Sequence, residues 1–118
     1  DPDPWEGAVK SGILQRKREN HGPFGQAWHK DSRFMCWIVP AGGVFKLRPA
    51  QHKDGRVVVS GIEEVLDLRE WELSPKDNGA KFVLTPEASP GSSRISLRGS
   101  SVEETEGWVA ALSVYCAG

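Results

Sequence analysis

The chain has 118 residues, of which 38% are hydrophobic and 26% charged, and its formal net charge is −1. This length predicts one domain with a single core, and the composition is that of an ordinary globular domain. No apolar run approaches the roughly 20 residues that a membrane-spanning helix needs. The amino end lacks the basic and then apolar layout of a signal peptide. The sequence starts at Asp1, so we expect it to be part of a longer protein.

The charges are unevenly distributed along the chain. Residues 8–56 hold ten Lys and Arg against three acids, whereas residues 57–118 hold five against ten. This asymmetry favours a surface with one positive side, although charges that merely solvate opposite faces of a sheet would give the same count. The acidic second half argues against a nucleic-acid partner.

Catalytic and metal-binding patterns are missing from the sequence. Cys36 and Cys116 are far apart and outside any CxxC motif, so we expect two buried free thiols in a reducing compartment. The three histidines are scattered, and their spacing predicts no metal site. The chain has no nucleophile-elbow motif, no phosphate-binding loop and no Cys–His pair at a plausible spacing. We therefore expect a non-catalytic protein that needs no cofactor.

In chain order, residues 1–7 are predicted to be a linker, because Pro2 and Pro4 cannot join the interior of a sheet. Residues 8–118 form the predicted domain. Loop residues rich in Gly, Pro and polar side chains are expected at 20–26, 40–43 and 49–55. Short strands are predicted at 9–18, 33–39, 44–48, 56–60, 65–73, 81–85 and 94–98. Many short strands at close spacing indicate a sandwich or a barrel.

The last segment has the pattern of a helix instead. Ser101 followed by Glu104 is a capping-box pair, and acids crowd the first turns, where the helix dipole favours them. Four apolar residues then repeat with the spacing of one helical face: Trp108, Ala111, Leu112 and Tyr115. This face must be buried, and closing the open end of a bent sheet would bury it.

Three segments, taken in order, resemble motifs of the pleckstrin-homology (PH) domain family. Residues 12–16 (Gly-Ile-Leu-Gln-Arg) are similar to its Gly-x-Leu-x-Lys opening strand, with Arg in place of Lys. Residues 28–34 resemble its Trp-Lys-x-Arg-x-Phe entry to the second strand. Residues 108–112 (Trp-Val-Ala-Ala-Leu) match its Trp-x-x-Ala-Leu helix. The resemblance implies a mainly β fold, a seven-stranded bent sheet or partly open barrel capped by a carboxy-terminal helix.

The second segment departs from the family pattern. Phe34 follows Trp28 by six positions, whereas five is usual, and Arg33 directly precedes Phe34. A one-residue slip in a strand exchanges the side chains that face the core with those that face solvent. It therefore stays open at this point which of Lys30 and Arg33 faces the site.

The resemblance implies a module that targets a membrane by binding anionic phospholipid headgroups, either phosphoinositide or phosphatidic acid. The site would lie on strands one to three and their first loop. Its basic residues would be Arg16, Arg18, Lys30, Arg33, Lys46 and Arg48. Two of these, Arg16 and Arg18, share one strand face, as a common anion site requires. In the first loop, Phe24 is the expected membrane-inserting residue.

Such a module would be monomeric, cytoplasmic and peripherally associated with the membrane. Its size and short leading segment are also similar to those of the acylated PH-domain proteins of apicomplexan parasites, which would imply phosphatidic acid. The alternative is a protein-interaction module with little affinity for lipid. The same superfold in phosphotyrosine-binding domains accepts peptides by strand addition, here along residues 65–73, and other PH domains bind protein partners.

Overall fold

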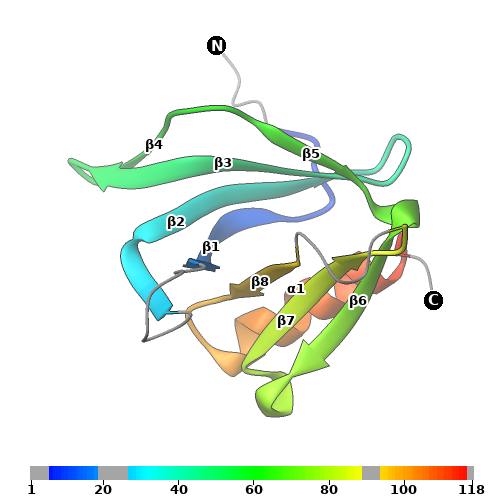
Figure 1. The fold of residues 1–118 in the computed structure, drawn as a ribbon. Helices are drawn as coiled ribbons and strands as arrows, with labels where there is room; N and C mark the ends of the chain where they lie inside the picture. Colours follow the sequence, from blue (N-terminus) through cyan, green and yellow to red (C-terminus); the bar gives the residue numbers. More distant parts are fainter. Residues whose placement is uncertain (1–5, 19–26, 89–93, 117–118) are drawn as a thin grey trace.

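The computed structural model describes residues 6–18, 27–88 and 94–116, with the backbone alone for Arg18 and residues 27–32. Eight strands and one α-helix follow one another within these ranges (Figure 1). The strands are β1 (Ser11–Arg18), β2 (Ala27–Val39), β3 (Val44–Lys53), β4 (Arg56–Val59), β5 (Glu64–Asp67), β6 (Trp71–Lys76), β7 (Lys81–Pro86) and β8 (Ile95–Arg98). Short 3-10 helices at Leu68–Glu70 and Asp77–Gly79 flank β6, and helix α1 spans Val102–Ser113.

The strands form one bent antiparallel sheet in the spatial order β4-β3-β2-β1-β8-β7-β6. The sheet turns at β1, which pairs with β2 from Ser11 onward and with β8 through Gln15 and Arg16. Figure 1 shows β2 to β5 as one layer and β6 to β8 as another, with α1 packed beside the second. The predicted class, a mainly β bent sheet that is not closed and carries a carboxy-terminal helix, is confirmed.

Two short strands share one edge position of the sheet. Strands β4 and β5 both pair with β3, β4 with its residues 50–53 and β5 with its residues 44–47. Together they occupy one edge, so the eight strands fill seven positions. Pro49 of β3 lies at the break, and its carbonyl accepts a hydrogen bond from Ser60 N at 2.8 Å. In a strand, the N–H and C=O groups of one residue point toward the same neighbouring strand. The N–H group that proline lacks would therefore have faced this edge, at the break.

Three of the predicted strands differ from the structure by three residues or more. Strand β2 begins at Ala27 instead of residue 33, and β3 continues to Lys53 through most of the expected 49–55 turn. The predicted strand 65–73 is interrupted by the 3-10 helix Leu68–Glu70, whose first turn is capped by the Asp67 carboxylate accepting from Arg69 N at 3.1 Å. Leu66 and Leu68 are both buried, with the less buried Asp67 between them, so the start of the turn still has the alternation of a strand.

Helix α1 closes the sheet as its pattern predicted. The Ser101 hydroxyl accepts a hydrogen bond from Glu104 N at 3.1 Å, which satisfies one of the free amides at the helix start. Trp108 and Leu112 are buried in the main core. The other two residues of the predicted face, Ala111 and Tyr115, are partly buried and pack against the same core. The helix therefore covers the core from the end that the sheet leaves open.

Candidate functional site

Strands β1 to β3 carry apolar side chains on both faces. Leu14, Cys36 and Leu47 are fully buried in the main core, on what we call the inner face. Met35 and Trp37 are buried in a smaller cluster on the outer face. Side chains alternate along a strand, and residues directly opposite in antiparallel strands share a face. The register therefore assigns each candidate residue to one face.

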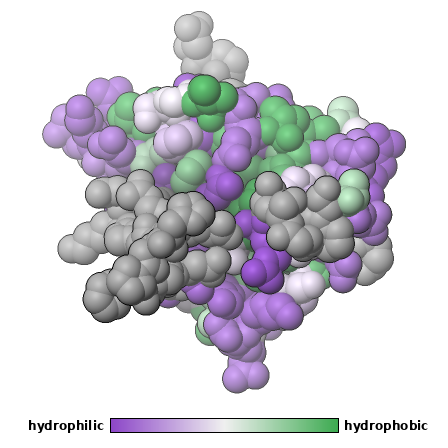
Figure 2. Space-filling model, viewed as in Figure 1, coloured by the Kyte–Doolittle hydropathy of each residue, from purple (hydrophilic) through white to green (hydrophobic). Residues whose placement is uncertain are grey.

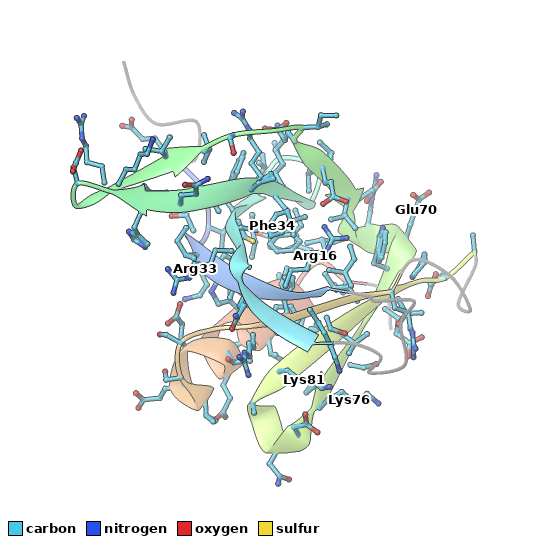
Figure 3. The ribbon with its side chains drawn as sticks, turned by 60° about the vertical axis from the view of Figure 1, so that its left-hand side comes forward. Arg16, Arg33, Phe34, Glu70, Lys76 and Lys81 are labelled. Carbon is cyan, nitrogen blue, oxygen red and sulfur yellow. The ribbon has the colours of Figure 1, made fainter. Side chains whose placement is uncertain are left out.

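Arg16 lies on the inner face, near the end of β1. It pairs with Leu97 of β8, which is fully buried. Its guanidinium carbon is 5.3 Å from the centroid of the Phe34 ring, and its Nη1 donates a hydrogen bond to Glu64 Oε2. The Arg16 side chain is 25% exposed, so it is largely withdrawn from water. Figure 3 shows Arg16 and Phe34 side by side in the space that the bent sheet encloses.

We call Arg16, Phe34 and Glu64 the mouth cluster. Three separate strands supply its members, β1, β2 and β5. The aromatic face attracts the guanidinium by a cation–π interaction. The carboxylate shows that this guanidinium is placed to hold an oxyanion. Chemically, the mouth cluster is an arginine anion site that is already occupied by a side chain of the same chain.

Lys46 and Arg48 lie on the outer face, opposite the outward residues of β2. The Lys46 Nζ is 3.6 Å from Glu63 Oε2. The Arg48 Nη2 donates a hydrogen bond to the carbonyl of Gly61 at 3.2 Å, while its Nε is buried without a hydrogen-bond partner. Both side chains are therefore engaged by the segment that connects β4 to β5.

Arg33 also lies on the outer face, because it pairs with Gln15, next to the inward Leu14–Phe34 pair. Arg33 is exposed, and Figure 3 shows it on the other side of β2 from Arg16. The register jumps here, from Gln15 opposite Arg33 to Lys17 opposite Trp28. Residues 29–32 of β2 are thus extra residues opposite Arg16 alone. This bulge accommodates the unusual spacing from Trp28 to Phe34.

The predicted basic residues do not all gather at one point. Among the described side chains, Arg16 is on the inner face and Arg33, Lys46 and Arg48 are on the outer face. Arg18 is the last residue of β1 and Lys30 lies within β2, but their side chains fall outside the described part of the chain. Phe24 falls outside it altogether. The complete lipid site stays a prediction.

The acids of the site were not expected from the sequence. Glu63 and Glu64 are adjacent in the sequence and point apart: Glu63 reaches Lys46 on the outer face and Glu64 reaches Arg16 on the inner face. Their role as partners of the candidate cations was missed. The Arg16–Glu64 contact joins residues 48 positions apart, and only the register of the folded sheet reveals it.

The two cysteine thiols have the properties of unreactive, structural groups. Both cysteines are free, and burial raises the pKa of each thiol, to about 11 for Cys116. A high pKa keeps a thiol protonated and unreactive at neutral pH. Within the described residues, no three His, Cys, Asp or Glu side chains are grouped as a metal would require. None of the described helices has the length and apolar character needed to cross a bilayer.

Comparison with solved structures supports the PH-like fold. The chain aligns with a chain in the crystal structure of human RhoA in complex with the DH/PH fragment of PDZRHOGEF, with a TM-score of 0.60 and 11% sequence identity. The alignment covers 92% of this chain and 28% of that one. A likeness at this identity concerns the fold alone. No family model matches the sequence, and no curated protein matches it.

Proposed function

We propose that this domain is a non-catalytic module that docks a larger protein onto a membrane by binding anionic phospholipid headgroups. The observation that carries the proposal is the mouth cluster, in which the Arg16 guanidinium lies over the Phe34 ring and holds a carboxylate. A guanidinium presents paired donors that fit phosphate oxygens as well as carboxylate oxygens. A headgroup phosphate at this position would be held at the point where β1 runs into the first loop.

The other basic residues contribute to membrane binding in two ways, by direct contact with the headgroup and by long-range electrostatic attraction. Arg18 follows Arg16 by two positions on β1, and Lys30 lies on the neighbouring strand, so both are proposed as direct headgroup ligands beside Arg16. Phe24, in the connection between these strands, is the proposed membrane-inserting residue. The outer-face cations Arg33, Lys46 and Arg48 act through the electrostatic field instead. Each cation near an anionic leaflet adds about 1 kcal/mol of attraction.

Two arginines on opposite faces provide a matched test. Co-sedimentation with vesicles that contain phosphatidylinositol 4-phosphate or phosphatidic acid compares wild type with Arg16→Ala and Arg33→Ala. Both variants lose one arginine and the same charge, from neighbouring positions of adjacent strands. We expect Arg16→Ala to weaken binding about tenfold or more, since a charged hydrogen bond is worth about 1.5–3 kcal/mol. Arg33→Ala should weaken it by about fivefold or less, the effect of one cation acting through the field.

The possible results separate the function from the site. If wild type binds anionic vesicles no better than neutral phosphatidylcholine vesicles, the lipid function is wrong. If Arg33→Ala weakens binding more than Arg16→Ala does, the function stands but the headgroup lies on the outer face. Vesicles of the same charge made with phosphatidylserine show how much of the binding is electrostatic attraction alone.

A protein-interaction function is the second candidate, and exposed apolar residues at one edge of the sheet favour it. Val58, Ile62 and Val65 on the β4–β5 edge are 44%, 86% and 58% exposed. Figure 2 shows hydrophobic residues along the upper rim of the molecule. These strands form an outer edge of the sheet, where a peptide strand could add to the unpaired backbone. The similar fragment was crystallised with a protein partner, RhoA.

Ile62 discriminates between the two functions. Ile62→Asp places a charge at this exposed apolar position and is expected to abolish association with a protein partner that uses this edge. It should weaken vesicle binding by no more than the effect of one added charge, about 1 kcal/mol, because the mouth cluster does not include Ile62. A calorimetric titration of wild type and Ile62→Asp with RhoA is the direct comparison. Binding of wild type alone would favour the protein-interaction function.

A further inference from the structure

The junction between the β4–β5 connection and β5 meets cations on both faces of the sheet. Glu63 ends the connection and Glu64 begins β5, and the two point to opposite sides. Glu64 contacts Arg16 on the inner face, and Glu63 Oε2 is 3.6 Å from the Lys46 Nζ on the outer face. The two acids thus form two separate ion pairs of the same kind, one inside the mouth cluster and one outside it.

Register explains why Glu64 reaches the mouth. Glu64 is paired with Leu47, whose side chain is fully buried on the inner face, and Leu66 two residues later is also in the core. The Glu64 side chain is 43% exposed and that of Arg16 is 25% exposed. The pair therefore sits at the boundary between core and solvent, where an incoming anion can reach it.

An anion that approaches Arg16 must compete with this carboxylate. Glu64 already neutralises the guanidinium, and its negative charge also repels a second anion at the same position. Two unit charges separated by a few ångströms near a protein surface interact more strongly than they do in bulk water. A ligand with a single negative charge gains little from replacing one carboxylate with another group of equal charge. A ligand with a higher charge gains more.

We propose that Glu64 is a built-in competitor for the anion position of Arg16 that lowers the affinity for every anion, so that only phosphomonoesters, which Arg16 attracts most strongly, keep a useful affinity. This inference rests on the proposed lipid function and specifies its ligand. A phosphomonoester carries about −1.5 to −2 charges at neutral pH, with three acceptor oxygens. It can displace the carboxylate from Arg16. A phosphodiester, which carries a single charge, cannot do so as effectively. Phosphoinositide phosphates and phosphatidic acid both carry a phosphomonoester.

The adjacent glutamates supply the experiment with its own control. Glu64→Gln and Glu63→Gln change the net charge equally, at neighbouring positions, with nearly unchanged size. Four vesicle compositions are compared at equal surface charge: phosphatidylinositol 4-phosphate, phosphatidic acid, phosphatidylinositol and phosphatidylserine. The first two carry a phosphomonoester and differ in its source. The last two do not carry one. Dissociation constants come from co-sedimentation for wild type and both variants.

Wild type is expected to bind the two phosphomonoester vesicles more tightly than the other two. Glu64→Gln should tighten binding to all four by at least about threefold, the effect of one partly screened charge. The tightening should be at least as large for the two phosphomonoester vesicles, because a carboxylate repels a ligand of higher charge more strongly. Glu63→Gln should stay within about twofold of wild type. Unequal binding to the first two compositions identifies which source of phosphomonoester the site prefers.

Two outcomes would overturn the inference while leaving the proposed function intact. One is that Glu64→Gln binds like wild type, and the other is that Glu63→Gln tightens binding equally, which would reduce the effect to net charge. Binding of no anionic vesicle by any of the three proteins would overturn the proposed function itself, and the inference with it. Melting curves check folding. If Glu64→Gln melts early, Glu64→Asp, which keeps the charge on a shorter side chain, replaces it.

Discussion

The Trp108 ring of α1 meets the Phe45 ring of β3 edge-on, with the ring centroids 6.0 Å apart and the planes inclined by 62°. On another side, the Lys10 Nζ is 5.4 Å from the centroid of the Trp108 ring. Trp108 is 1% exposed, so it joins the helix to the sheet from within the core. This contact is central to the stability of the fold.

Replacing Trp108 with alanine is expected to lower the free energy of unfolding by about 3–5 kcal/mol, because a large buried ring would leave a cavity. Urea denaturation followed by circular dichroism measures the change. Lys10→Ala removes only the cation above the ring and should cost about 1 kcal/mol or less. If Trp108→Ala unfolds at the same urea concentration as wild type, the helix does not hold the sheet in this way.

Gly43, in the β2–β3 turn, lets the Tyr115 side chain pack closely against the backbone. Gly43 has a φ of +62°, and a Cβ at this position would lie 3.1 Å from Cδ1 of Tyr115. We expect Gly43→Ala to destabilise the domain by about 1–3 kcal/mol, from the strained backbone and the close contact together. Gly12→Ala is the control, because its Cβ would be 3.7 Å from Trp108 Cζ2, an ordinary contact. Equal melting temperatures for the two variants would contradict this account.

The two thiols should differ in accessibility and share low reactivity. Cys36 is fully buried, and Cys116 is partly buried with its pKa raised by burial to about 11. Because the thiolate is the reactive form, we expect both to react with iodoacetamide at pH 8 more slowly than free cysteine does. Cys36 should become reactive only when urea unfolds the protein. Mass spectrometry of the digested protein assigns the label, and rapid native labelling of Cys36 would be inconsistent with this core.

Asp67 and Arg69 give the domain a small pH dependence. The Arg69 side chain donates from Nε and Nη2 to the two oxygens of Asp67, at 3.0 and 2.8 Å. These hydrogen bonds lower the pKa of the Asp67 carboxyl. A lowered pKa in the folded state stabilises it above the ordinary value of about 4, and this contribution is lost as the pH falls through the lowered pKa.

Arg69→Ala should therefore raise the pKa of Asp67 toward its ordinary value in a carbon-detected NMR titration. The stability of this variant should fall less steeply than that of wild type as the pH drops below about 4. Because Arg69 is exposed and Asp67 is only partly buried, the effect on stability is small. A wild-type Asp67 that already titrates at its ordinary value would show that the pair does not form in solution.

The sequence predicts the helix better than it predicts the strand boundaries. The signals that define α1 lie within 15 residues, from the cap at Ser101 to Tyr115, and all of them concern local hydrogen bonds or one helical face. By contrast, Leu66 and Leu68 are both buried although a 3-10 helix begins between β5 and β6. Periodicity reports which side chains are buried and cannot show that the backbone turns between them.

The composition of the site depends on register, which no local pattern contains. The bulge opposite Arg16 decides that Phe34 faces inward and Arg33 outward. The break between β4 and β5 decides that Glu64 lies within reach of Arg16. The sequence could therefore identify Arg16 as a candidate, but it could not identify the ring and the carboxylate that surround it.

The orientation of the domain on a bilayer tests the lipid-docking claim most directly. Nanodiscs that contain phosphatidylinositol 4-phosphate and a headgroup spin label broaden the amide NMR signals of the residues nearest the membrane. We expect the broadened amide signals to be centred on the end of β1 at Arg16–Arg18 and on the start of β2, with the signals of helix α1 unaffected. Broadening centred on α1 or on the β4–β5 edge, or no broadening at all, would contradict it.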